Sequence, residues 1–242
     1  MAVRLRDLLM EPLRPFDHFY VSGIGNSSSK KAWAIGYEDV LPPYLTLTLD
    51  PSLDEIQQAL GAEDEQERFL LSKTVHPLNP TAEDLQSEGD TRRVFYTRIA
   101  LPVQLAFEQM LKLRSEVGPS GPTNCRETAD FSWVNGEQCA LVGEFKRHSI
   151  IHPKKWTGEE TADANRILLG RELRGYCDKY KTTAAALFDG EYLILLIFNP
   201  DEKQSVTDEK CPVLGFIFHY TSPRLRYCLF RVASFQLRRC RA

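Results

Sequence analysis

The chain has 242 residues, of which 43% are hydrophobic and 26% are charged, and its formal net charge is −3. This length suffices for one well-filled core, alone or with an appended subdomain, and the chain has no apolar run of 18 residues that would predict a membrane span. The overall charge gives no sign of nucleic-acid binding, but residues 1–100 carry 16 acidic and 10 basic side chains, whereas residues 101–242 carry 17 and 20. An anionic partner is therefore expected to meet the C-terminal half.

The N-terminal segment and the cysteines bear on the compartment. The short apolar run of MAVRLRDLLMEPLRPFDHFY is interrupted by Glu11 and Pro12 and is followed by no small-residue cleavage site, so we expect no secretory signal. The six cysteines form no CxxC pair and no metal-site spacing. Cys139 lies in an apolar strand pattern, where we expect a reduced, packed thiol. These features favour the cytosol or the nucleus.

Residues 1–93 are predicted to form a helical and irregular extension packed on the remainder of the chain. Ser52 and Glu55 match a capping box, which predicts that a helix begins at the next residue after Ser52. A second helix is expected over residues 63–73, and TAED at Thr81 has the composition of a further helix start.

Residues 94–242 are predicted to form the second unit. Residues 94–99 suit a short strand, and residues 102–117 carry apolar side chains at spacings of three and four, which predicts an amphipathic helix. Two strands are expected on either side of Asn135-Gly136, a strong hairpin signal. The expected elements are these strands at 129–134 and 138–146, a helix at 165–181, and strands at 184–188, 191–198, 213–220 and 226–235. This order predicts a mixed α/β layer structure.

Glu144 and Lys146 are two residues apart on the second strand of the first hairpin. Because side chains alternate between the faces of a strand, Phe145 can pack inward while Glu144 and Lys146 point together to the other face. With a two-residue Asn135-Gly136 loop, Asp130 would pair with residue 141 and lie on the wrong face. With a three-residue loop or one bulge it would pair with residue 142, diagonally beside Glu144, and we predict this extra residue. Two carboxylates so placed can hold Mg²⁺, and Lys146 can orient a bound water.

Asp130, followed fourteen residues later by Glu144-Phe145-Lys146, resembles the PD-(D/E)XK nuclease superfamily, although Ala129 stands where the motif has proline. The expected layout of helix, three strands, helix and strand over residues 94–198 is similar to the core of that family. The segment RELRGYCDKYKTTAAALFDGEYLILL also looks like the helix and strand that follow the motif in fungal members. The resemblance implies a restriction-endonuclease-like α/β (α+β) fold with a mixed central sheet flanked by helices.

The resemblance also implies roles for particular residues. Asp130 and Glu144 would bind Mg²⁺ or Mn²⁺, and Lys146 would position the water that attacks a phosphodiester bond of DNA or RNA. In many members a polar residue of the following helix faces the site; Arg171 and Arg174 are the matching candidates here, with Glu172 as a less favoured one. No other cofactor is implied.

Four residues after the motif are candidate contacts to nucleic acid: Arg147, His148, Lys154 and Lys155. For the lysines a solvated loop is an equal alternative, and for His148 an exposed strand end is the simpler interpretation.

Two other interpretations of the chain stay open. One is a catalytically inactive nuclease-like domain that serves as a protein- or nucleic-acid-interaction module, with a protein partner or a homodimer. The other is a different α/β domain in which Glu144 and Lys146 form a surface ion pair on an edge strand.

Overall fold

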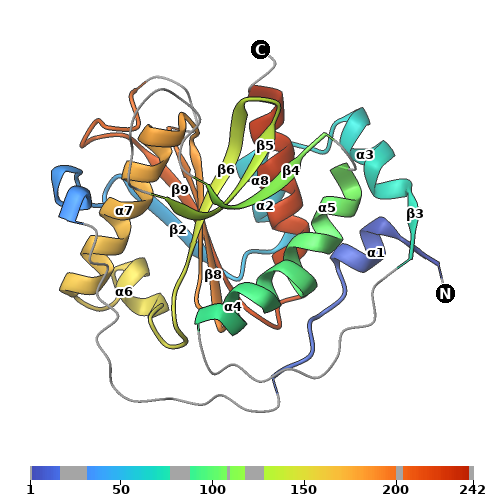
Figure 1. Ribbon diagram of the computed structural model, residues 1–242, viewed down its shortest axis with the longest axis horizontal. Helices are drawn as coiled ribbons and strands as arrows, with labels where there is room; N and C mark the ends of the chain where they lie inside the picture. The colour runs from blue at the N-terminus through green and yellow to red at the C-terminus, as the bar shows by residue number, and fades with distance from the viewer. Residues whose placement is uncertain are drawn as a thin grey trace.

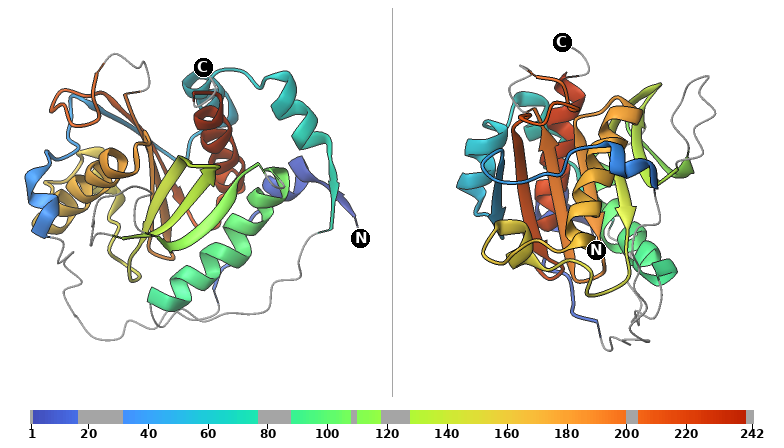
Figure 2. Two further views of the ribbon diagram at one scale, coloured as in Figure 1. Left: turned by 45° about the horizontal axis from the view of Figure 1, so that its top comes forward. Right: turned by 90° about the vertical axis from the view of Figure 1, so that its left-hand side faces the viewer.

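The structure is a computed structural model that describes residues 2–16, 32–76, 88–107, 110–117, 128–199 and 204–239. Within these residues a seven-stranded mixed sheet is covered by helices on both faces (Figures 1 and 2). The predicted α/β class, with a mixed central sheet flanked by helices, is therefore confirmed.

The sheet combines antiparallel and parallel pairs. In sheet order its strands are β2 (Leu45–Leu49), β9 (Val213–His219), β8 (Tyr192–Phe198), β7 (Ala184–Phe188), β6 (Gln138–Phe145), β5 (Ala129–Asn135) and β4 (Lys112–Val117). The strands β4 to β8 are thus neighbours in chain order, and among them only the pair β6/β7 is parallel. A separate two-stranded sheet joins β1 (Val3–Arg4) to β3 (Thr74–Val75).

The helices divide between the two faces of the sheet (Figure 2). One face carries the 3₁₀ segment η1 (Ala32–Gly36), α6 (Pro153–Thr157) and α7 (Ala164–Tyr180). The other face carries α1 (Leu5–Leu9), α2 (Leu53–Leu60), α3 (Glu65–Ser72), α4 (Glu88–Val94), the π-helical segment η2 (Phe95–Ala100), α5 (Leu101–Phe107) and α8 (Leu225–Arg239). Each face has its own apolar cluster, so the sheet is the middle layer of three.

Local signals located several elements correctly. The Ser52–Glu55 capping box is present, since the Glu55 amide donates to Ser52 Oγ at 3.2 Å and the Ser52 amide donates to Glu55 Oε2 at 2.7 Å. The helix expected over 63–73 is α3, and both predicted hairpins form as β5/β6 and β7/β8. The helix start at Thr81 lies outside the described residues.

Two predictions before the first hairpin need correction. The strand expected over residues 94–99 is wrong, because α4 continues through η2 into α5 and buries Val94, Ile99 and Val103 on one helical stripe. The helix expected over 102–117 is correct only as far as Phe107, and residues 112–117 form β4. Pairing of β4 with β5 at the sheet edge prevails over the helical spacing of its apolar residues.

The strand expected over residues 226–235 is also wrong, because this segment belongs to α8. Short apolar runs do not distinguish a buried strand from a buried helix. Here nearly every side chain of the helix is buried, including Arg231, which is 0% exposed.

The division between residues 1–93 and 94–242 stays a prediction. α4 spans that boundary, and β2 from the first part pairs in parallel with β9 at the edge of the main sheet. In the described parts of the chain no helix has the length and apolar character needed to cross a membrane. The described cysteines (Cys139, Cys177, Cys211 and Cys228) are free thiols and buried.

Candidate active site

The hairpin of β5 and β6 contains a one-residue bulge, one of the two predicted alternatives, but both its turn and its register differ from the prediction. Asn135 pairs with Gln138, so the two-residue turn is Gly136-Glu137, with Gly136 at a φ of 61°. The register then shifts by one residue at Ala140, because residue 134 pairs with 139 and residue 133 with 141. Continued past the pair 131–143, this register sets Asp130 opposite Glu144 rather than opposite residue 142.

Asp130 lies at the end of β6 that carries the Glu144-Phe145-Lys146 motif. Its Oδ2 accepts a hydrogen bond from the backbone amide of Phe145 at 2.7 Å, and its Oδ1 lies 3.4 Å from Arg92 Nη2 of α4. The Asp130 side chain is 17% exposed, more than the side chains of Glu144 and Lys146, at 5% and 8%. Solvent therefore reaches this group of residues chiefly beside Asp130.

Glu144 and Lys146 form a buried ion pair beneath α7. Lys146 Nζ donates to Glu144 Oε1 at 2.6 Å and lies 3.6 Å from Oε2 of Glu172, which is 0% exposed. The hydroxyl of Tyr176 donates to Glu144 Oε2 at 2.9 Å. Glu172 and Tyr176 are four residues apart on α7, so both project from one face of that helix toward the sheet. We call Asp130, Glu144, Lys146, Glu172 and Tyr176 the acidic cluster.

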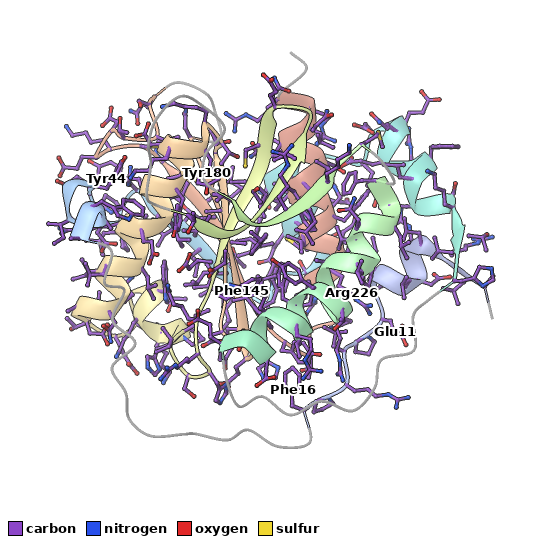
Figure 3. All side chains as sticks on the ribbon, viewed as in Figure 1. Glu11, Phe16, Tyr44, Phe145, Tyr180 and Arg226 are labelled. Carbon is purple, nitrogen blue, oxygen red and sulfur yellow. The ribbon has the colours of Figure 1, made fainter. Side chains whose placement is uncertain are left out.

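Phe145 packs on the other face of the sheet, as the alternation predicts. Its ring contacts Phe95 and Phe131, with centroid distances of 5.2 Å for each pair, and it lies near the middle of the molecule in Figure 3. The alternative of a surface ion pair on an edge strand is therefore wrong, because β6 lies between β5 and β7 and the Glu144–Lys146 pair is buried.

Tyr176 stays protonated in this environment. Burial raises its pKa, and the neighbouring charges of Glu144 and Glu172 raise it further. Three acceptors lie around its hydroxyl: Glu144 Oε2 at 2.9 Å, the Thr128 carbonyl at 3.1 Å and Glu172 Oε1 at 3.3 Å. Because one hydroxyl has only one proton to share among them, acceptors outnumber donors around Tyr176. A positively charged group is therefore favoured beside these oxygens.

Asp130 and Glu144 are the residues that could hold a metal ion. In the described ranges no three His, Cys, Asp or Glu side chains group as a complete metal site. Mg²⁺ commonly binds one or two protein carboxylates, because water and substrate phosphate complete its coordination. Carboxylate oxygens that accept one hydrogen bond keep further lone pairs. The donor chemistry therefore fits a hard divalent cation, in competition with the Lys146 ammonium that now pairs with Glu144.

Arg171 and Arg174 do not join the acidic cluster. Arg174 is buried and its Nη1 donates to the carbonyls of Val206 and Asp208, at 2.7 Å each. Arg171 lies near Asp39 instead. Burial raises the pKa of Asp39, and the positive charges of Arg166 and Arg171 oppose that rise. Their positions on α7 are turned away from the face that carries Glu172 and Tyr176.

The predicted nucleic-acid contacts are spread over the segment after β6. Arg147 is exposed, and His148 Nδ1 lies 3.7 Å from Glu191 Oε2. Lys154 is exposed on α6, whereas Lys155 donates to Asp163 Oδ2 at 2.6 Å. The structure thus brings Asp130, Glu144 and Lys146 together and leaves the predicted basic residues outside the cluster.

Sequence reasoning underrated Glu172 and missed Tyr176. The available signal was their spacing of four residues on a helix that follows the Glu-x-Lys motif, which puts an acid and a phenol on one face. The resulting set of carboxylates, an ammonium and a neutral phenol can bind a cation and orient a water molecule. Searches of protein-family models, curated proteins and solved structures found no match to the chain.

Proposed function

We propose that the protein is a metal-dependent nuclease of the PD-(D/E)XK type, which hydrolyses phosphodiester bonds of DNA or RNA. The observation that carries this proposal is the bond from the Phe145 amide to Asp130 Oδ2 at 2.7 Å, between Glu144 and Lys146. It joins the two halves of a motif that are fourteen residues apart in the chain.

The topology around the motif supports the same proposal. The helix α5, the strands β4, β5 and β6, the helix α7 and the strand β7 occur in this order along the chain, with the short helix α6 between β6 and α7. This is the sequence of elements that the resemblance implies, and the four strands are neighbours in the sheet. Fold alone does not establish activity, so the proposal depends on the chemistry of the acidic cluster.

Each residue of the cluster has a role in the proposed reaction. Asp130 and Glu144 would hold Mg²⁺ or Mn²⁺ through their carboxylate oxygens. The bound ion would supply charge neutralisation at the phosphate and a more acidic water. Lys146 would orient that water and stabilise developing negative charge. Tyr176 holds Glu144 by a hydrogen bond from a phenol that stays protonated, and Glu172 places a second carboxylate 3.6 Å from Lys146 Nζ.

A second candidate is a catalytically inactive nuclease-like domain that binds a protein or nucleic-acid partner. The observation that favours it is the closure of the cluster, in which Lys146 already neutralises Glu144 and both side chains are less than 10% exposed. A buried ion pair of this kind can be retained without any catalytic role.

Calorimetric titration with Mg²⁺ and Mn²⁺ separates the two candidates. The nuclease proposal expects metal binding by the wild type, loss of binding in Asp130→Asn and Glu144→Gln, and unchanged binding in Glu137→Gln, an exposed acid in the turn of the same hairpin. Asp130→Asn is the more informative variant, because its partly exposed side chain is the less disruptive one to change.

Cleavage of single- and double-stranded DNA and RNA with the same ions tests the chemistry, with Lys146→Met as the defective variant. Cleavage by Lys146→Met at the wild-type rate would contradict the proposed role of that residue. A folded wild type that binds neither ion supports the interaction module instead.

A further inference from the structure

A hollow of about 150 Å³ is lined by residues that adjoin β6, β8 and β9, and it has no part in the proposed chemistry. Its wall includes Phe16, His148, Glu191, His219, Tyr220 and Thr221. All of them lie in described segments. Phe16 is at the lower margin of the labelled side chains in Figure 3, below the sheet.

The hollow lies at the end of the sheet where the parallel strands β6, β7 and β9 terminate. β6 and β7 run parallel, β9 runs in the same direction as β7, and His148 and His219 lie at or just beyond the C-terminal ends of β6 and β9. Ligands of open α/β sheets bind in crevices outside these ends. His148 follows Lys146 by two residues, and the Lys146 amide is tied to the end of β7 by a 2.9 Å bond to the Phe188 carbonyl.

One buried carboxylate holds the wall of the hollow in place. Asp189 Oδ2 accepts from the amides of Ile150 and Ile151, at 3.1 and 2.8 Å, next to His148. Its Oδ1 accepts from the amides of Glu191 and Tyr192, at 3.0 and 2.8 Å. The segment with His148 and the turn with Glu191 are therefore fixed to each other before any ligand arrives, which lowers the entropic cost of binding.

The wall offers flat apolar surface together with one acidic group. Phe16 stacks on Tyr220 with centroids 4.3 Å apart, and both are buried. The imidazole of His219 is exposed, and its Nδ1 lies 2.8 Å from Thr221 Oγ1. The side chain of Glu191 is 30% exposed and can accept hydrogen bonds from a ligand. Flat rings and an acceptor suit a planar heterocycle that carries N–H donors, not a phosphate.

We propose that this hollow holds one unpaired base of a single-stranded nucleic acid. The identification of the ligand as nucleic acid rests on the proposed nuclease function. Unpaired bases are recognised by stacking on aromatic and histidine rings and by hydrogen bonds to their edges. A glutamate accepts from the exocyclic amino group of cytosine, which thymine lacks. The subsite therefore selects strands over duplexes and amino-bearing bases over thymine.

Binding, rather than cleavage, is the test. Fluorescence anisotropy would measure affinity for labelled oligo(dC), oligo(dT) and a blunt duplex of about eight nucleotides, in EDTA so that no strand is cut. We expect oligo(dC) to bind about tenfold more tightly than the duplex, and His219→Ala to remove about that factor, as the loss of one stacked base would. Glu191→Ala should abolish the preference for oligo(dC) over oligo(dT).

The matched controls are His152→Ala and Glu137→Ala, two exposed residues away from the hollow, which should leave binding unchanged. Equal binding of strand and duplex, or equal effects of the control variants, would overturn the proposal. Competition by free dCMP as strong as by oligo(dC) would show a nucleotide site instead of a strand subsite. Loss of cleavage in Asp130→Asn with base-dependent binding retained would separate this inference from the proposed function.

Discussion

Replacement of Lys146 by methionine should destabilise the protein by about 3–5 kcal/mol, the usual cost of removing one partner of a buried ion pair. The ammonium lies 2.6 Å from Glu144 and 3.6 Å from Glu172, whose side chains are 5% and 0% exposed. Methionine keeps most of the apolar stem but leaves two buried carboxylates without this cation. The expected loss is a large share of the roughly 5–15 kcal/mol of a typical domain. Urea denaturation followed by circular dichroism measures it.

The double variant Lys146→Met/Glu144→Gln tests the reasoning. Removing the Glu144 charge as well should restore part of the loss, because only one of the two buried carboxylates, Glu172, is then left without the ammonium. Lys154→Met is the matched control, since that lysine is exposed on α6, and its denaturation midpoint should equal that of the wild type. A loss below about 1 kcal/mol in Lys146→Met, in the range of surface pairs, would refute the account of the cluster as a buried electrostatic network.

Two further predictions concern groups outside the cluster. Burial raises the pKa of Asp189 to about 6 despite its amide donors, so protonation favours the folded state and this contribution to stability is lost as the pH rises through 6. As the pH falls from about 7 to about 5, the melting temperature of the wild type should therefore rise relative to that of Asp189→Asn. A difference in melting temperature that stays constant over this range would contradict the raised pKa. Arg231→Ala should cost about 3–5 kcal/mol in urea denaturation, because it leaves Glu67, which is 2% exposed, without its 3.2 Å partner. Arg238→Ala removes the more exposed partner of the same carboxylate and should cost about 1 kcal/mol; equal losses would show that burial does not set the cost.

Much of the framework was predictable from local patterns. The Ser52 capping box, the helix α7 and the two hairpins follow from short-range chemistry, namely side-chain capping, helical spacing and turn residues. The errors fall where a segment suits two structures. Residues 112–117 and 226–235 carry apolar side chains that either a helix or a strand would bury, and contacts with distant parts of the chain decided between them.

In the candidate site, too, local patterns predicted only part of the arrangement. A strand pattern was enough to predict that Phe145 turns inward and that Glu144 turns to the opposite face. The position of Asp130 depended on the bulge at Ala140, a one-residue shift that reverses the faces of all later pairs. Helical spacing left Arg171, Glu172 and Arg174 as competing candidates, and the packing of α7 against β6 brought Glu172 to Lys146.

By itself the sequence determined the hairpin, the spacing between Asp130 and the Glu-x-Lys motif, and the alternation that separates Glu144 from Phe145, because these depend on residues close in the chain. Only the tertiary structure decided that Asp130 meets the Phe145 amide, that Lys146 is buried between two glutamates, and that Tyr176 reaches Glu144. Apart from the Glu144–Lys146 pair, those contacts join residues 15 to 32 positions apart. They form because burying the apolar faces of the sheet and of α7 fixes both elements in one relative position, which no local pattern specifies.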